Sequence, residues 1–383
     1  MQFLPLAATL LRPDKLLAWN LYDETGELLL RRGFMLSDPN QIASLIKRGV
    51  FVEAEDYKAW QQLNLTAAPP PAPPPPPVKA LNTFTLRDAI AGKLLLLLRN
   101  AGQEPDFTAH TQELAHAIKV LVDGTPDVAL AGIQIHEHSK YAVAHSVDVA
   151  ILVEFLSRKL DWTDDQRCST VCAALTMNLG MAEAQSIMAL QRMAITEIQR
   201  KLITEHPQAG HALLQAAGVE DALWLQIALD HHEAPDGSGY PGAKTALNPE
   251  TLLLRTADIY SALLIARPTR KALDSASAIK AVFVQEKQHQ NEFGGLLLKE
   301  LGLYPPGALV KLKNGDTAVV SRRACGSTPL MVHSFINSHG IPMLEPMWRE
   351  TSRAEFALVG GLTHEDVKVP VDIEKIWAAQ VRN

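Results

Sequence analysis

The chain has 383 residues, 47% of them hydrophobic and 20% charged, which is the composition of an ordinary soluble globular protein and excludes wholesale disorder. The formal net charge is −6 and no lysine- or arginine-rich block is present, so we expect no surface for duplex nucleic acid or for anionic lipid. Three scattered cysteines and the lack of any apolar run near the roughly 18 residues of a membrane span favour a cytoplasmic protein.

Residues 1–65 carry the pattern of a small α+β module. Two strands are predicted over 16–22 and 27–32, with a turn between them, and a helix is predicted over 39–49. Residues 51–52 could return as a third strand. Because this segment carries no catalytic constellation, we expect it to act as a regulatory or docking module.

Residues 66–80 are a proline-rich linker. Eight of the nine residues in Pro69–Pro77 are proline, which excludes a backbone ladder and predicts a polyproline II spacer of about 28 Å at ~3.1 Å per residue. A ligand for an SH3-type domain is the alternative, but a spacer between two folded units is the commoner use of such a stretch.

Residues 81–303 are almost wholly helical in pattern. Asn248 and Pro249 form an N-cap followed by a proline at the first helical position, and Pro207 is predicted to open a helix that Gly218 closes. The periodic apolar segments that predict helices are 88–99, 114–122, 141–160, 165–175, 195–203, 211–217 and 249–265.

Residues 304–383 form a β-rich extension. A breaker at 304–307 is followed by Asn314-Gly315, which predicts a hairpin with a type I′ turn. The predicted strands are 308–313, 316–322, 330–336 and 341–344. The whole chain is therefore expected to be mainly α, a helical domain between a small N-terminal α+β module and a small C-terminal antiparallel β unit.

The residues that point to chemistry begin with the string His231-His232-Glu233, which is followed by the glycine-rich segment 236–242. Adjacent imidazoles at a helix end, next to a glycine-rich turn, suit a metal site beside a loop that approaches a ligand. A solvated helix end with an ordinary turn is the alternative, and the length of the string makes it the less favoured one.

Three further candidates lie elsewhere in the helical region. His145 lies on an apolar helix face, His206 precedes Pro207, and Asp258 lies on a face with Leu254. Taken singly, each of them is more simply explained as a buried residue with satisfied hydrogen bonds or as a polar group at a helix end. A buried carboxylate such as that of Asp258 needs a cation or hydrogen-bond donors to stay ionised. Together with His231 and His232 they are ligands of the kind that bind iron, manganese or zinc.

These motifs resemble those of the HD-GYP family over roughly 141–303. The resemblance implies an all-α HD-superfamily domain, a phosphodiesterase site with two or three metal ions, and cyclic di-GMP or its linear product as the ligand. It also implies that the GYP loop, named for Gly239, Tyr240 and Pro241, can engage a GGDEF-domain protein. The residues that it implies for dinucleotide binding are Gly239, Tyr240, Pro241, Arg267 and Arg270.

The chain departs from the family pattern where members carry an adjacent His-Asp pair and a nearby lysine. Met177, Asn178 and Met181 stand at these positions, and Tyr141 and Ser261 stand where some members have further carboxylates. Two-metal hydrolysis relies on a carboxylate that bridges both cations, and a thioether is a poor ligand for hard metals. We therefore expect no tuned two-metal centre, and regard Met177, Asn178 and Met181 as vestigial catalytic positions.

Three hypotheses follow. The first is a degenerate HD-GYP protein, catalytically silent or weak, that binds the dinucleotide or a GGDEF-domain partner. The second is an active phosphodiesterase with one weakly bound iron, manganese or zinc ion on His206, His231 and His232, since three histidines can activate water in other proteins. The third is a helical scaffold in which these histidines have no ligand.

Overall fold

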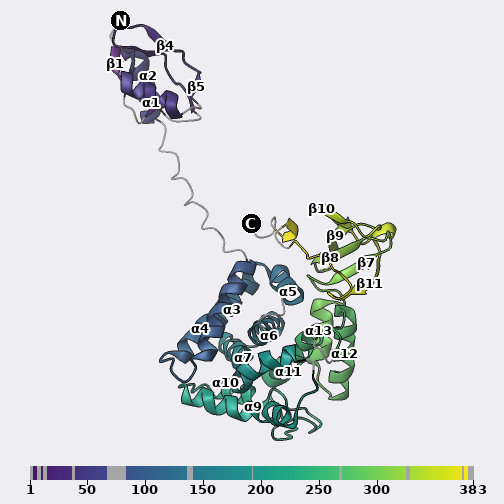
Figure 1. The fold of residues 1–383 in the computed structure, drawn as a ribbon. Coiled ribbons are helices and arrows are strands. Elements are labelled where there is room, and N and C mark those ends of the chain that lie inside the picture. The colour runs from purple at the N-terminus through teal and green to yellow at the C-terminus, as the bar shows by residue number, and fades with distance from the viewer. Residues whose placement is uncertain are drawn as a thin grey trace. The chain divides into compact units, whose positions relative to one another are not determined.

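The computed structural model describes residues 3–6, 10–11, 15–36, 39–66, 83–135, 141–191, 193–266, 270–324, 328–372 and 375–377. Figure 1 shows the chain as two compact units, Met1–Val78 and Lys79–Asn383, and each has a hydrophobic core of its own. The predicted proline-rich stretch 69–77 and the predicted ligand Arg267 lie outside the described residues. No helix in the described part of the chain is both long and apolar enough to pass through a bilayer.

The first unit is the small α+β module that the sequence predicts. It contains a four-stranded sheet and a separate two-stranded sheet, and its core includes Trp19, Leu21 and Val52. Its elements are β1 (Phe3–Pro5), β2 (Lys15–Leu16), β3 (Leu21–Tyr22), β4 (Leu28–Leu30), β5 (Met35–Leu36), α1 (Pro39–Arg48), β6 (Phe51–Glu53) and α2 (Ala54–Thr66).

One strand prediction in this unit is wrong. The predicted strand over 16–22 is broken into β2 and β3, because β2 pairs with β5 whereas β3 pairs with β4 and β6 in the other sheet. The chain between the two strands turns Trp19 into the core, where its ring lies 4.8 Å from that of Trp60. The change of sheet could not be read from a run of apolar residues.

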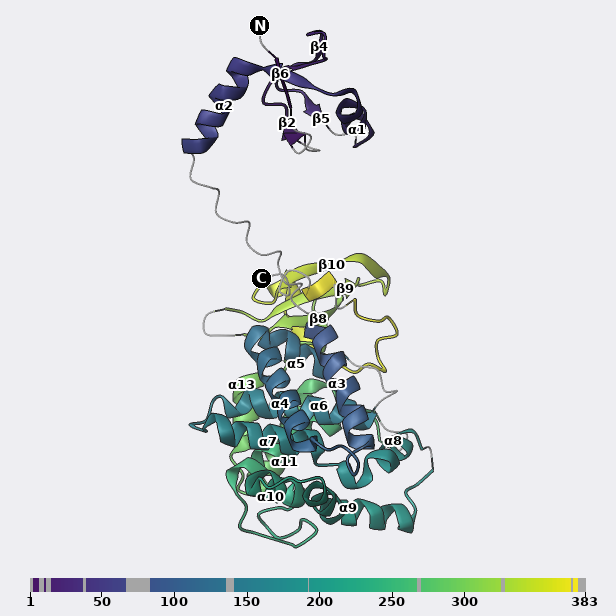
Figure 2. The same cartoon turned by 90° about the vertical axis from the view of Figure 1, so that its left-hand side faces the viewer.

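The second unit is a bundle of helices with a β sheet at one end, as Figure 2 shows. Nearly every described side chain of α6 is buried, and α6 contacts α4, α7, α8 and α11, so it is the central helix of the bundle. The helices are α3 (Thr83–Arg99), α4 (Phe107–Gly124), α5 (Pro126–Gln134), α6 (Tyr141–Ser157), α7 (Asp164–Thr176), η3 (Leu179–Met181), α8 (Ala182–Leu190), α9 (Glu197–Ala216), α10 (Ala222–Asp230), α11 (Pro249–Leu263), α12 (Ser275–Gln288) and α13 (Phe293–Leu301).

Local signals define several of these helix ends. Thr163 and Thr196 each form a capping box with the glutamine three residues later, and Asn248 caps α11 by accepting a hydrogen bond from the backbone of Thr251. The predicted helix start at Pro207 is wrong, however, because α9 runs without interruption through Pro207. The carbonyl of Ile203, which would lack a donor because of Pro207, is taken by the side chain of His206.

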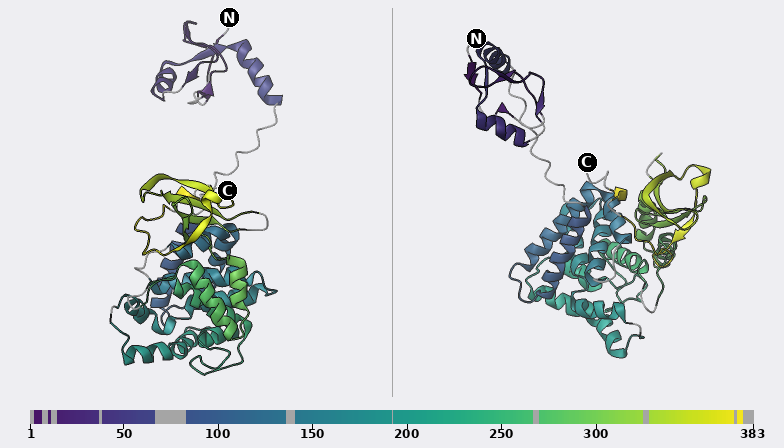
Figure 3. Two further views of the ribbon diagram at one scale, coloured as in Figure 1. Left: turned by 90° about the vertical axis from the view of Figure 1, so that its right-hand side faces the viewer. Right: turned by 45° about the horizontal axis from the view of Figure 1, so that its top comes forward.

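The C-terminal sheet is antiparallel, with strand order β10-β9-β8-β7-β11. It packs on the bundle through contacts of β8 with α5 and of β11 with α12, a region that is visible from two further sides in Figure 3. Its elements are β7 (Leu309–Leu312), β8 (Thr317–Arg322), β9 (Met331–Ile336), β10 (Pro342–Glu350), η4 (Ala354–Phe356) and β11 (Leu358–Leu362).

The hairpin between β7 and β8 is present, but its predicted type I′ turn is wrong. A type I′ turn needs positive φ at both central residues, and of the pair Asn314-Gly315 only Gly315 has it, at 89°. The amide of Gly315 donates to the carbonyl of Leu312 at 2.9 Å. The central residues of this turn are therefore 313 and 314, and Gly315 is its last residue.

The mainly α fold with a small α+β module before it and a small β unit after it is thus confirmed. The helical domain and the C-terminal sheet lie together in the second unit, and the limit predicted between them at 303 stays a prediction.

Candidate functional site

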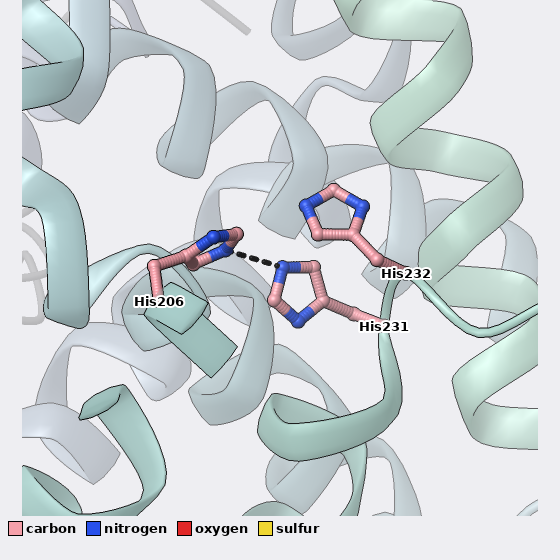
Figure 4. Close-up of side chains that lie close together, drawn as sticks. All are labelled: His206, His231 and His232. Atoms are coloured by element: carbon pink, nitrogen blue, oxygen red, sulfur yellow. Dashed lines mark hydrogen bonds between the residues drawn. The ribbon is translucent and has the colours of Figure 1, made fainter. Parts of the chain in front are cut away.

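Three of the predicted metal ligands come together where the middle of α9 meets the C-terminal end of α10. His206 lies in α9, whereas His231 and His232 directly follow the last residue of α10. Their ligand nitrogens all lie within 4.8 Å of one another, and Figure 4 shows the three rings grouped around one point. His206 and His231 are fully buried and His232 is half-buried.

Close backbone packing brings His206 to this place. A Cβ atom on Gly180, in η3, would lie 2.3 Å from the carbonyl oxygen of His206 and 2.7 Å from the amide nitrogen of Gly210. Real Cβ atoms do not approach that closely, so only glycine allows η3 to lie against α9. The same contact places Asn178 and Met181, which flank Gly180, beside the histidine cluster.

The hydrogen bonds of His206 and His231 determine which ring nitrogens are free. The Nδ1 of His206 contacts the carbonyl oxygen of Ile203 at 2.6 Å, and the Nδ1 of His231 contacts that of Ala228 at 2.8 Å. A carbonyl only accepts, so both Nδ1 atoms carry a proton. In the neutral rings both Nε2 atoms are then bare acceptors, and they face each other at 3.2 Å, along the dashed line of Figure 4.

Two lone pairs at this distance repel each other unless a cation lies between or beside them. Ligating histidines commonly donate their second ring N–H to a carbonyl, which fixes the ring and raises the basicity of the ligating nitrogen. His206 and His231 both have this arrangement. The cluster therefore fits a divalent metal ion, which these two histidines and His232 would hold.

Pro207 explains why the side chain of His206 bonds to the carbonyl of Ile203, and that bond in turn allows α9 to continue through the proline. In an unbroken helix the carbonyl of Ile203 would accept from the backbone N–H of residue 207, which a proline lacks. The side chain of His206 takes that carbonyl instead. Pro207 thus removes a competing donor from the carbonyl that orients a metal ligand.

Burial keeps all three rings in the neutral form that metals require. It lowers the pKa of His206 from 6.5 to about 3, lowers the pKa of His231, and lowers the pKa of His232 well below the usual value. Charge repulsion from neighbouring histidines acts in the same direction on His206 and His232.

The other two predicted ligands form a pair of their own. The Nε2 of His145, in α6, lies 2.7 Å from a carboxylate oxygen of Asp258, in α11, and its Nδ1 lies 3.2 Å from the hydroxyl of Ser261. Burial alone raises the pKa of Asp258, but the hydrogen bond and charge of His145 outweigh burial and hold that pKa below its usual range. Among the described residues, neither side chain belongs to the cluster of close metal-ligating atoms.

The three vestigial positions have different surroundings. Met177 is 1% exposed and packs in the hydrophobic core of the bundle, whereas Asn178 and Met181 line a cavity of about 440 Å³. His145, His232, Tyr240 and Asp258 line the same cavity. Asn178 therefore presents an uncharged amide to the cavity that His232 and Asp258 also line.

The GYP loop folds back onto the histidines. The ring of Tyr240 stacks on that of His232 with centroids 4.7 Å apart, and the backbone amide of Tyr240 donates to the carbonyl of His232. A Cβ on Gly239 would lie 2.4 Å from the backbone of Glu233, so a glycine is required there. The loop thereby presents Tyr240 to the cavity.

Glu233 holds this loop, a role that was not predicted. Its fully buried carboxylate accepts backbone N–H bonds from Gly242 and from Lys244, the latter at 2.9 Å. The Nζ of Lys244 in turn lies 2.8 Å from Asp230, at the end of α10. The position of Glu233 directly after the paired histidines was the available signal, but a loop contact nine and eleven residues away is a tertiary feature.

Arg270, predicted to contact the dinucleotide, lines the cavity but also has a second role. Its guanidinium donates to the carbonyls of Ala262 and Ile265, at the C-terminal end of α11. It therefore satisfies helix-end carbonyls that have no partner within the helix.

Comparisons with known proteins cover the helical region. Residues 110–292 match the family model of the HD domain. The cyclic di-GMP phosphodiesterase PA4108 of Pseudomonas aeruginosa is 30% identical over 222 residues, which is 57% of this chain and 53% of that protein. The 3'3'-cGAMP-specific phosphodiesterase 3 of Vibrio cholerae is 29% identical over 174 residues, covering 44% of this chain and 37% of that protein.

A third relative and one solved structure are also similar. The cyclic di-GMP phosphodiesterase response regulator RpfG of Xanthomonas campestris is 31% identical over 119 residues, covering 30% of this chain and 31% of that protein. The structure of Bd1817, an HDG"Y"P protein from Bdellovibrio bacteriovorus, aligns with a TM-score of 0.48 at 18% identity, over 77% of this chain and 97% of that one. The chain spans about half, or less, of the length of these curated relatives.

Proposed function

We propose that this chain, whose residues 110–292 match the family model of the HD domain, is a member of the HD-GYP family and a cyclic di-GMP signalling protein that binds the dinucleotide with little or no hydrolysis. Its cavity would take cyclic di-GMP or the linear product. A single divalent ion, iron, manganese or zinc, would be held by His206, His231 and His232. The cytoplasmic location expected from the cysteine content is part of this proposal.

One observation carries the proposal. Within the described residues the close group of metal-ligating atoms consists of three histidines and includes no carboxylate. Two-metal phosphoester hydrolysis needs an anionic bridge that offsets the repulsion between the cations. Asn178 offers an uncharged amide near this cluster, and Asp258 is paired with His145 instead.

The chain's own residues have separate tasks in this proposal. A bound divalent ion supplies Lewis-acid polarisation of a phosphoryl oxygen and acidifies water. Tyr240, held by Glu233 through the loop, would contact the ligand beside His232, and Arg270, which lines the cavity, would face its phosphates. Arg267, which lies outside the described residues, stays a predicted second phosphate ligand. Gly239 and Pro241 shape this loop, and the loop is also the surface that we propose for a GGDEF-domain partner.

A second candidate function is an active phosphodiesterase with a single metal ion. The arrangement of His206 and His231 favours it, because both rings are neutral, oriented by carbonyls and fully buried before any metal binds. Three histidines with an open position are chemically able to activate water. This candidate differs from the first only in turnover, so it can be tested in the same preparation.

The test is elemental analysis of protein purified without chelator, followed by hydrolysis of cyclic di-GMP with added Mn²⁺ or Fe²⁺. We expect a single ion per chain, measurable binding of cyclic di-GMP and negligible turnover. A single ion with turnover that His231→Ala abolishes would establish the second candidate. Two ions per chain with rapid turnover would overturn the proposal, and so would a protein that binds neither metal nor dinucleotide.

A gain-of-function variant sharpens this test. Asn178→Asp places a carboxylate on the wall of the cavity beside His232 and Asp258, and should raise the metal content above a single ion per chain. Asn100→Asp makes the same chemical change on an exposed residue after α3 and should leave the metal content unchanged. Equal metal content in both variants would show that the missing charge is not what limits the site.

A further inference from the structure

Helix α8 forms a mostly apolar wall of the cavity with one polar residue in its middle. Met181, the N-cap residue of α8, and Gln185, Met188 and Ala189 within the helix line the cavity at the spacing of one helix face. Three of them are apolar. The fourth, Gln185, is only 8% exposed, which is unusual for a glutamine unless its amide has hydrogen-bond partners.

The amide of Gln185 lacks such a partner on its oxygen. Its Oε1 is buried, and no group in the described part of the chain donates a hydrogen bond to it. Gln191, which lines the same cavity, differs because its Oε1 accepts a hydrogen bond from the side-chain amide of Gln199 at 2.6 Å. A buried carbonyl without a donor is costly in the free protein, so a ligand that supplies the donor recovers that cost.

The surroundings of Gln185 indicate what kind of group would supply it. Ile259, Ala262 and Leu263 of α11 line the same cavity and add further apolar surface to that of the two methionines. Methionine is flexible and polarisable and packs well against aromatic rings. A flat ring with hydrogen-bonding groups along its edge matches an apolar wall that carries a single amide.

We propose that Gln185 is a specificity-determining residue that binds the edge of a purine base, with the base lying against Met181 and Met188. This inference rests on the proposed function, because the base would belong to the cyclic dinucleotide whose phosphate lies near the histidine cluster. The Oε1 of Gln185 accepts an N–H of the base and its Nε2 donates to a ring acceptor, as glutamine amides do with purines in other complexes. Guanine and adenine both present such an edge.

The test compares Gln185→Met with the wild-type full-length protein by calorimetric titration with cyclic di-GMP and with cyclic di-AMP. Methionine keeps the volume and removes the amide, so we expect roughly 3- to 30-fold weaker binding of the preferred dinucleotide. We also expect a higher melting temperature of the ligand-free variant, because the unsatisfied oxygen is gone. Ser186→Ala, the neighbouring residue on α8, is the matched control and should change neither quantity.

The outcomes separate this inference from the proposed function. If the wild-type protein binds neither dinucleotide, the proposed function fails and takes this inference with it. If the wild-type protein binds and Gln185→Met binds equally well, only the inference fails. Weaker binding together with a lower melting temperature would also overturn it, because Gln185 would then support the fold and not the ligand. An unchanged metal content in the variant confirms that the histidine cluster is intact.

Discussion

The two groups of predicted metal ligands differ in what their nitrogen atoms face. In the cluster of His206, His231 and His232, two bare Nε2 atoms lie 3.2 Å apart with no proton between them. In the other group, the Nε2 of His145 lies 2.7 Å from Asp258 and its hydrogen-bonding capacity is used. The first group is incomplete without a cation, whereas the second is complete within the protein.

This difference shows that residue type alone does not define a metal site. Histidine and aspartate are both ordinary metal ligands, yet His145 and Asp258 form a hydrogen bond with each other here. In the cluster, carbonyls engage the Nδ1 atoms of His206 and His231, and this leaves their Nε2 atoms available to a cation.

Removing a ligand from the first group should have the largest effect. We expect His231→Ala to weaken metal binding by at least about 100-fold, more than the 10- to 100-fold typical of an outer-shell partner. Competition with a chromophoric chelator measures this affinity. Retention of wild-type metal affinity would show that the cluster is not the metal site.

The packing that brings the cluster together should be the next most sensitive. Gly180→Ala puts a Cβ 2.3 Å from the carbonyl oxygen of His206, a backbone atom that cannot swing away, so we expect a loss of roughly 3 kcal/mol of unfolding free energy. Gly92→Ala is the control, because Gly92 lies in α3 with nothing within 4 Å and should gain roughly 0.5–1 kcal/mol. Urea denaturation measures both, and equal effects would contradict the close-packing argument.

Acid should destabilise the metal-free protein through the same cluster. Burial lowers the pKa of His206 from 6.5 to about 3, so below pH 6.5 the unfolded chain binds a proton that the folded protein excludes. Stability is therefore lost as the pH falls from 6.5 towards 3, by about 2 kcal/mol at pH 5 from His206 alone. Denaturation of the apoprotein between pH 7 and pH 5 measures this, and a flat profile would contradict the burial of a neutral ring.

Pro207 offers a change whose two effects have opposite signs. Pro207→Ala restores a backbone N–H that competes with His206 for the carbonyl of Ile203, so metal affinity should fall roughly 10-fold. The same substitution replaces a proline in a helix interior and should raise the melting temperature. Chelator competition measures the metal affinity and thermal unfolding measures the melting temperature, both on one preparation. If the two quantities rose together or fell together, Pro207 would not act through His206.

The smallest effect is expected in the second group. Asp258→Asn keeps the shape of the side chain and removes the charge that pairs with His145, and we expect metal affinity to stay within about 3-fold of wild type. The same chelator assay measures it. A loss as large as that of His231→Ala would mean that Asp258 is a ligand of the same ion and would remove the distinction between the two groups.

Helices and hairpins with strong local signals were predictable. Where an element continues or breaks because of a tertiary contact, the sequence did not predict it. The capping of α11 by Asn248 follows from adjacent residues, as does the hairpin at Gly315. Pro207 was predicted to start a helix because a proline in a helix interior leaves a carbonyl without a donor. That penalty is removed by the His206 side chain, which is a contact that no propensity describes.

The candidate site divides in the same way. The string from His231 to Gly242 carried the resemblance and indicated where the candidate site lies, since paired histidines and a glycine-rich turn are local features. The role of Glu233 depends on how the loop after it folds back, nine and eleven residues later. The unsatisfied oxygen of Gln185 depends on which groups the packing of the helices leaves around it.

The amino-acid sequence by itself determined the fold class, the ligand types and the missing carboxylate, because composition, period and residue identity are properties of short segments. Only the tertiary structure decided that three histidines converge while His145 turns to Asp258, since α9 packs on α10 and α6 packs on α11. Hydrogen bonds form between whichever groups that packing brings within reach, and those bonds decide which nitrogens are left for a metal.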